Sequence, residues 1–137
     1  MKRIFADTNI IVDLIADRRP FSKYAIEIFS RAEQKDIELF TSSHSIATTY
    51  YLLKKYQNEE LLREILYDLF DFLTVIAVDS DILKMSLRSD YKDFEDAVQI
   101  YCASKIENLD CIVTRNIKDF KKSIIPVLSP EELVFKS

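Results

Sequence analysis

Acidic and amide side chains stand at the ends of predicted strands and at the start of a late helix. Asp7 directly follows the first apolar run, and Asn116 and Asp119 come just after a later one. Asp93 and Asp96 lie in the first turn of the helix that leads into that later run. Two carboxylates about 4 Å apart repel by roughly 4 kcal/mol at an effective dielectric of 20. A fold that gathers several acids must therefore protonate one of them or bind a cation, and oxygen ligands of this kind suit Mg²⁺ or Mn²⁺.

The composition leaves few alternatives to carboxylate chemistry. The 137-residue chain has no glycine, so it contains neither a GxGxxG dinucleotide fingerprint nor a GxxxxGK[ST] phosphate loop. One histidine, His44, excludes an HExxH metalloprotease motif, and two cysteines, Cys102 and Cys111, exclude a zinc ribbon or a disulfide scaffold. A metal-activated water that attacks a phosphodiester needs no Cys, His or Gly side chain. The composition is therefore compatible with metal-dependent phosphodiester hydrolysis.

Short apolar runs alternate along the chain with segments of helical periodicity. Strands are predicted over 3–6, 37–41, 74–78, 110–114 and 124–128, with helices over 10–15, 21–36, 43–56 and 79–87 and further helices starting at Asn58, Asp93 and Ser129. Such alternation implies a mostly parallel sheet covered on both faces. We therefore expect a single α/β domain over residues 1–137, a three-layer α/β/α sandwich with about five strands. Ligands of such sheets bind beyond the carboxyl ends of the strands, where the strand order reverses, and the acids should meet there.

Each of these acids also has a purely structural explanation. Asp7 and Asp93 stand where helix N-caps are expected, and Asp96 at the third helical position could simply interact with the helix dipole. Asp119 alone is an ordinary exposed acid, and His44 alone is an ordinary half-buried histidine. The combination of residues, and no single member, favours a metal site.

The combination resembles the PIN-domain family, which includes the VapC-like toxin ribonucleases of bacterial toxin–antitoxin pairs. The resemblance rests on four motifs: Asp7-Thr8-Asn9, Asp93-Phe94-Glu95-Asp96-Ala97, Thr114-Arg115-Asn116 with Asp119-Phe120, and Pro126-Val127-Leu128-Ser129-Pro130. Their order covers nearly the whole chain, from Lys2 to about Phe135. The resemblance implies a PIN-like fold and the metal-dependent hydrolysis of RNA by an endoribonuclease.

The resemblance also assigns roles to individual residues. Asp7 and Asp96 would bind Mg²⁺ or Mn²⁺, and with Asp119 they would form the catalytic set. The fourth acidic place would fall to Asn116 or Asp119. Supporting polar groups near the metal would be Thr8, Asn9, Asp93 and Thr114.

One position departs from the family pattern. The family usually has a Glu on the helix after the second strand, and the register here puts Thr48 there. A threonine hydroxyl can bind a metal-bound water but adds no charge, so the cation would be held more weakly than by four acids. The alternative hypothesis is therefore a catalytically weakened PIN-like module that binds nucleic acid or acts as a scaffold.

The charge balance limits how RNA could be held. A net charge of −4 argues against tight, non-specific binding, because phosphate contacts dominate the affinity for nucleic acid. A nuclease of this composition needs its metal ion and a local basic patch. Arg115 and Lys118 flank the proposed site and are the best-placed residues for RNA binding.

The resemblance implies partners as well. PIN toxins act as homodimers and are silenced by an antitoxin that covers the acidic rim, so we expect an antitoxin Arg or Lys near Asp7 and Asp96. The first helices carry more apolar residues than one short sheet needs, and part of this surplus should face a partner. The surplus includes Ile10, Ile11, Leu14, Phe21, Tyr50 and Leu53. The chain has no apolar run of about 18 residues and no signal-peptide pattern. We therefore expect a cytoplasmic protein with no membrane contact.

Two other acidic α/β classes fit less well. A haloacid dehalogenase-type phosphatase needs a second Asp two residues after its nucleophile, where Asn9 stands. A phosphoacceptor receiver domain needs an acid pair after the first strand and a Lys after the fifth, where Ser129 and Pro130 stand.

Overall fold

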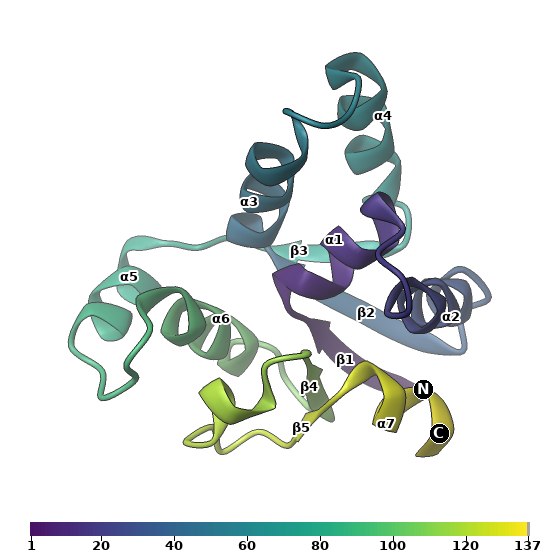
Figure 1. Cartoon of the computed structure of the whole chain (residues 1–137). Helices are drawn as coiled ribbons and strands as arrows, with labels where there is room; N and C mark the ends of the chain where they lie inside the picture. Colours follow the sequence, from purple (N-terminus) through teal and green to yellow (C-terminus); the bar gives the residue numbers. More distant parts are fainter. Residues whose placement is uncertain (137) are drawn as a thin grey trace.

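A parallel sheet of five strands forms the centre of the protein, in the spatial order β3-β2-β1-β4-β5. The computed structural model describes residues 1–136, and the sheet crosses the middle of the molecule (Figure 1). The strands are β1 (Lys2–Ala6), β2 (Ile37–Ser42), β3 (Leu73–Ile76), β4 (Cys111–Val113) and β5 (Val127–Leu128). All neighbouring strands run parallel, so the predicted sheet is confirmed.

The central strands bury side chains on both faces of the sheet. On β1, Ile4 and Ala6 belong to one hydrophobic cluster, whereas Phe5 belongs to another. Leu39 and Phe40 on β2 divide in the same way. Successive strand residues point to opposite faces, so a strand that is covered on both sides must be apolar at every position. This is why these strands form continuous apolar runs in the sequence.

Helices cover both faces and complete the predicted three-layer sandwich. They are α1 (Thr8–Ala16), α2 (Ser22–Glu33), α3 (Ser43–Leu53), α4 (Glu59–Leu69), α5 (Ser80–Leu87), α6 (Phe94–Ser104) and α7 (Pro130–Lys136), with a short 3-10 helix, η1 (Ile117–Phe120). Side chains of α1, α2, α3, α4 and α7 pack with Ile4, whereas those of α5, α6 and η1 pack with Phe5. In Figure 1, α5 and α6 lie to the left of the sheet and α2 to the right. Within the described residues, no helix has the length and hydrophobicity needed to cross a bilayer.

Some element boundaries differ from the sequence prediction. Helix α1 begins at Thr8, earlier than predicted, because the Asp7 side chain caps it. Strand β3 ends at Ile76 because the chain then leaves the sheet, and the N–H of Val78 donates to the side-chain Oγ of Ser43 (3.0 Å). Strand β5 is confined to Val127–Leu128. The turn at η1 was not predicted, since four residues of 3-10 helix leave no clear periodicity.

Several apolar residues of the first helices are core residues. Ile10 and Ile11 are fully buried and Leu53 is only 3% exposed, all within the cluster that covers one face of the sheet. The expectation of a partner is therefore wrong for these three side chains. The helices α1, α2 and α3 contribute to the same cluster, and Leu14 and Tyr50 pack against it partly buried. Phe21, by contrast, is 40% exposed.

The strand order reverses between β1 and β4. The chain proceeds from β1 to β2 and β3 on one side, and returns to place β4 and β5 on the other. Ala6 and Val113 are register partners, and the Asp7 N–H donates to the Val113 carbonyl at 3.0 Å. Asp7 and Thr114 therefore follow neighbouring strand ends at the reversal point, where ligands of parallel sheets bind.

Candidate active site

Asp7 is held rigidly at the start of α1. Its backbone is extended (φ −70°, ψ 162°), and its Oδ1 accepts from the Thr8 N–H at 2.8 Å, which makes it the N-cap of the helix. The side chain is buried, with 6% of the residue exposed, yet it lines a surface pocket. Asp7 thus combines the capping role with a place in the candidate site.

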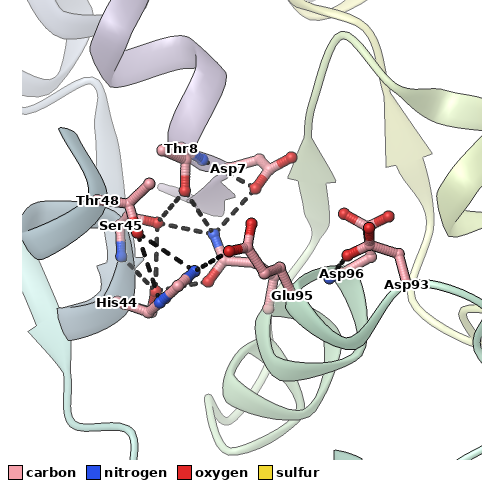
Figure 2. A network of polar contacts seen from close by, with 10 residues as sticks. Asp7, Thr8, His44, Ser45, Thr48, Asp93, Glu95 and Asp96 are labelled. Carbon is pink, nitrogen blue, oxygen red and sulfur yellow. Dashed lines mark hydrogen bonds and ion pairs between the residues drawn. The ribbon is translucent and has the colours of Figure 1, made fainter. Parts of the chain in front are cut away.

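Gln99 on α6 connects Asp7 to α3. Its Nε2 donates to Asp7 Oδ1 (2.9 Å) and to Ser45 Oγ (2.7 Å), and its Oε1 accepts from the Ser42 hydroxyl. The Thr8 hydroxyl completes this buried network through a 3.0 Å contact with Ser45 Oγ (Figure 2). Because Gln99 is 2% exposed, its amide is shielded from solvent and fixes the direction of the Asp7 carboxylate.

The other Asp7 oxygen is held from the end of β4. Thr114 Oγ1 donates to Asp7 Oδ2 at 2.8 Å and accepts from Asn9 Nδ2 (3.3 Å) and from the Asn116 N–H (3.1 Å). The predicted supporting residues Asn9, Thr114 and Asn116 therefore lie together around one edge of Asp7. Thr8 lies at its other edge, on the Gln99 side.

Asp96 lies in the first turn of α6 and lacks an ionic partner. Asp93 Oδ1 caps this helix by accepting from the Asp96 N–H at 3.0 Å. No protein donor among residues 1–136 reaches the half-buried Asp96 carboxylate. Burial, followed by the nearby charges of Asp93, Asp7, Asp119 and Glu95, raises the pKa of Asp96 to about 7. Its ionised form is therefore the form that a bound cation would stabilise most.

Asp96 lies between two hollows of the surface and lines both of them. The first, which we call the amide basin, also contains Asp7, Thr48 and Asn116. The second, which we call the lysine basin, also contains Asp119. The two candidates for the fourth acidic place therefore lie on opposite sides of Asp96.

The wall of the amide basin opposite Asp96 is formed by α3. Thr48 Oγ1 lies 3.3 Å from His44 Nε2, and that same nitrogen lies 3.8 Å from Glu95 Oε1 on α6. Glu95 reaches across toward His44, whereas Asp93 and Asp96 lie on the other side of the first turn of α6 (Figure 2). At the position where the family usually has Glu, Thr48 thus faces the basin together with its neighbour His44.

The two basic residues expected to contact RNA have different surroundings. Arg115 forms a bidentate pair with Asp13, at 2.6 Å (Nε–Oδ2) and 3.1 Å (Nη2–Oδ1), and its guanidinium lies 4.2 Å from the centre of the Phe21 ring. Asp13 is 1% exposed, so this pair is an internal structural contact. Lys118 is exposed and lines the lysine basin next to Asp119.

Sequence reasoning missed the residues that hold Asp7 from α3 and α6. Gln99 and Ser45 are absent from the predicted site, although Gln99 lines the amide basin. One signal was available for Gln99: it lies three residues after Asp96, on the same face of a helix. No local pattern marks Ser45, because its partners come from distant parts of the chain.

The donor set fits a hard divalent cation that keeps most of its water. The charges of four acids, Asp93, Asp7, Asp119 and Glu95, act on Asp96 and raise its pKa. Among residues 1–136, no three His, Cys, Asp or Glu side chains are grouped closely enough to hold a metal by themselves. One or two carboxylates completed by water are the usual protein contribution to a Mg²⁺ site. Asp7 and Asp96 meet that requirement.

The fold and the acid-lined crevice define a class of parallel α/β proteins that gather carboxylates where the strand order reverses. Comparison with known proteins identifies the family: a PIN domain model matches residues 3–118. Ribonuclease VapC1 of Aquifex aeolicus (strain VF5) is 32% identical over 136 residues, which cover 96% of this chain and 92% of that protein. The chain belongs to the PIN domain family.

Solved structures share the fold over almost the full length. A chain of a toxin-antitoxin complex from Klebsiella pneumoniae is 28% identical with a TM-score of 0.66, covering 93% of this chain and 97% of that one. A chain of VapBC2 from Rickettsia felis, bound to a DNA fragment from its promoter, is 21% identical with a TM-score of 0.65 and coverages of 93% and 98%. The predicted PIN-like architecture is therefore confirmed.

Proposed function

We propose that this protein is a divalent-metal-dependent endoribonuclease that acts as the toxin of a toxin–antitoxin pair. The observation that carries the proposal is the pairing of a fixed carboxylate, Asp7, with an unpartnered one, Asp96, at the reversal point of a parallel sheet. The 32% identity to a VapC ribonuclease over almost the whole chain supports the choice of RNA as the substrate.

Asp7 and Asp96 are the residues that would hold Mg²⁺ or Mn²⁺. When bound, such an ion polarises the scissile phosphate and lowers the pKa of the attacking water. Gln99 and Thr114 keep the Asp7 carboxylate in one orientation through hydrogen bonds of 2.9 and 2.8 Å. Asp93 fixes the first turn of α6 and thereby the backbone that carries Asp96.

Asp119, which lines the lysine basin, would complete the catalytic set. Asp119 follows the strand end on η1 and contributes to the electrostatic field at Asp96. Asn116, on the amide-basin side, brings an amide but no charge. We therefore assign the fourth acidic place to Asp119, in agreement with the charge requirement of a cation site.

A second candidate function is favoured by one specific observation. Thr48 supplies no charge where the family usually has Glu, which points to a weakened PIN-like module that binds nucleic acid or acts as a scaffold. Calorimetric titration with Mn²⁺ separates the two functions. Saturation well below millimolar Mn²⁺ supports the enzyme, and no binding at millimolar Mn²⁺ supports the module.

Cleavage of RNA tests the proposed activity directly. Purified protein is incubated with structured and unstructured RNA in Mn²⁺ and in EDTA, together with the variants Asp96→Asn and Asp68→Asn. Asp68 is an exposed acid of α4 that lines neither basin, so Asp68→Asn controls for the loss of one charge. Cleavage that depends on Mn²⁺ and on Asp96 supports the proposal, whereas cleavage that survives EDTA or Asp96→Asn contradicts the metal mechanism.

The proposal includes an antitoxin partner and a homodimer in the cytoplasm. The related toxin-antitoxin complex from Klebsiella pneumoniae supports the first of these. An apolar hollow between α3 and α4, lined by residues such as Ile46, Tyr51 and Tyr67, offers a surface for such a partner. Expression of the protein alone should slow growth and expression of Asp96→Asn should not. A wild type that is harmless in its native host without any neighbouring gene product would contradict the toxin role.

A further inference from the structure

The lysine basin gathers four lysines beside Asp96 and Asp119. Lys92 comes from the loop before α6, Lys118 lies in η1, and Lys121 and Lys122 follow η1 directly. Two segments that are far apart in the sequence therefore place their ammonium groups around one hollow. This clustering stands out in a chain whose net charge is −4.

The ammonium groups of these lysines are not neutralised by contact with acids. Among residues 1–136, no carboxylate oxygen lies within 4.0 Å of any of the four, although four aspartates line the same basin. Lys122 Nζ donates to a backbone carbonyl, that of Asp90, at 3.3 Å. Arg3, Arg31 and Arg115 of the same chain, by contrast, each pair with an acid. The basin therefore presents free hydrogen-bond donors to an incoming anion.

The charge of the basin depends on the proposed cation. Four lysines and four aspartates line it, so their formal charges cancel. A divalent cation at Asp96 would leave the basin with a net charge of about +2. The amide basin, on the other side of Asp96, has Arg18 and His44 as its basic residues. The stronger attraction for a polyanion therefore lies on the lysine side.

We propose that the lysine basin binds the phosphate backbone of the RNA on one side of the bond that is cut. This inference rests on the proposed function, because it places the scissile phosphate at Asp96, the residue shared by both basins. The strand then passes from the lysine basin across Asp96 into the amide basin. Compact ammonium groups serve as point-charge partners for phosphate, and the ring of Tyr91, held edge-on by Tyr101 at 6.2 Å, adds a wall for a base.

The test compares two double variants that remove the same charge. Lys121→Gln/Lys122→Gln alters the basin. Lys2→Gln/Lys105→Gln alters exposed lysines at the opposite end of the strands, where β1 begins and α6 ends. Binding of a fluorescent 12-nucleotide single-stranded RNA is measured between 50 and 200 mM salt, in EDTA and again with Ca²⁺ in place of Mn²⁺. In parallel, kcat and KM for cleavage of the same RNA are measured in Mn²⁺.

Loss of two phosphate contacts should reduce the slope of log K against log salt by about 1.4, since single strands give about 0.7 per contact. The control double variant should keep the wild-type slope. In the cleavage assay, KM should rise for the basin variant while kcat stays unchanged, because these contacts bind substrate and transition state equally.

The outcomes separate this inference from the proposed function. Two results would contradict the binding of RNA by the lysine basin. One is RNA cleavage with equal salt slopes and equal KM values in both double variants. The other is a wild type that does not bind RNA. RNA binding that depends on the lysines, without any RNA cleavage in Mn²⁺, would support the role of the lysine basin and contradict the proposed ribonuclease activity. Thermal unfolding of both variants within about 2 °C of the wild type, as expected for exposed residues, shows that neither effect comes from misfolding.

Discussion

The guanidinium of Arg115 donates two hydrogen bonds to the carboxylate of Asp13, with lengths of 2.6 and 3.1 Å. Asp13 lies in the middle of α1 and is 1% exposed. Arg115 follows β4, so the pair ties the first helix to the strand end that supplies Thr114. Because Asp7 caps the same helix and is held by Thr114, the ion pair helps to keep Asp7 and Thr114 in place relative to each other.

Removal of Asp13 should therefore destabilise the whole fold. Breaking a buried pair by deleting one partner leaves an uncompensated charge, which costs about 3–5 kcal/mol. We expect Asp13→Ala to lose a free energy of unfolding in this range, measured by urea denaturation. The exposed Asp68→Ala should stay within about 0.5 kcal/mol of the wild type. Equal stability of the two variants would show that the pair contributes nothing to the fold.

The parts of the site that the sequence could predict are those with local determinants. Asp7 and Asp93 cap their helices through bonds to residues at most three positions away, and such caps can be read from residue type and spacing. The pairing of Arg115 with Asp13 joins residues 102 positions apart. Arg115, which the sequence places beside the site as a residue for RNA binding, is consequently the half-buried partner of Asp13, and only the packing of α1 against β4 decides this pairing.

The position of Gln99 shows a further limit. Its amide is buried and bonds to Asp7, Ser42 and Ser45, which come from three separate elements. Its spacing of three residues from Asp96 places it on the same helix face, but that spacing does not reveal the partners that it meets on the other elements. The continuous apolar runs of the strands, by contrast, predicted the sheet correctly, because burial on both faces dictates residue type at every position.

Replacement of Gln99 by Leu should loosen the metal site and the fold together. The substitution leaves buried donors and acceptors unpaired around Asp7, which costs about 1–3 kcal/mol. Outer partners of metal ligands typically change metal affinity by about 10–100-fold. We expect the Kd for Mn²⁺, measured by calorimetry, to rise by that factor in Gln99→Leu.

Gln34→Leu serves as the matched control for that substitution. Gln34 is exposed at the end of α2 and lines neither basin, so both its stability and its Mn²⁺ affinity should match the wild type. A Gln99→Leu protein that binds Mn²⁺ as well as the control would mean that the Asp7 carboxylate needs no orientation from α6.

Restoration of a carboxylate at position 48 should strengthen the site. Thr48 lines the same basin as Asp7 and Asp96, so Thr48→Glu adds a hard oxygen ligand and a negative charge beside the cation. We expect the Kd for Mn²⁺ to fall by about tenfold, which corresponds to about 1.4 kcal/mol. Thr74 on β3 is exposed and remote from both basins, so Thr74→Glu should leave the Kd for Mn²⁺ unchanged. An unchanged affinity in Thr48→Glu would show that position 48 does not reach the metal.

The raised pKa of Asp96 predicts an unusual dependence of stability on pH. Burial and the surrounding acids raise this pKa from 3.8 to about 7, so between these values the folded protein binds more protons than the unfolded chain. The contribution of Asp96 to stability must therefore fall as the pH rises from about 4 to 7. In EDTA at pH 7.5, Asp96→Asn should be more stable than the wild type by about 1 kcal/mol, a value reduced for the partial exposure of the carboxyl. The difference should vanish near pH 4.

Metal ions should reverse that order, because they bind the ionised carboxylate. Addition of Mn²⁺ should raise the melting temperature of the wild type more at pH 7.5 than at pH 5.5, and should leave Asp96→Asn almost unchanged. Thermal unfolding of wild type, Asp96→Asn and Asp68→Asn across this pH range measures both effects. Parallel pH profiles for all three proteins in EDTA would mean that Asp96 titrates as an ordinary surface acid, and that the charge crowding around it is relieved without a cation.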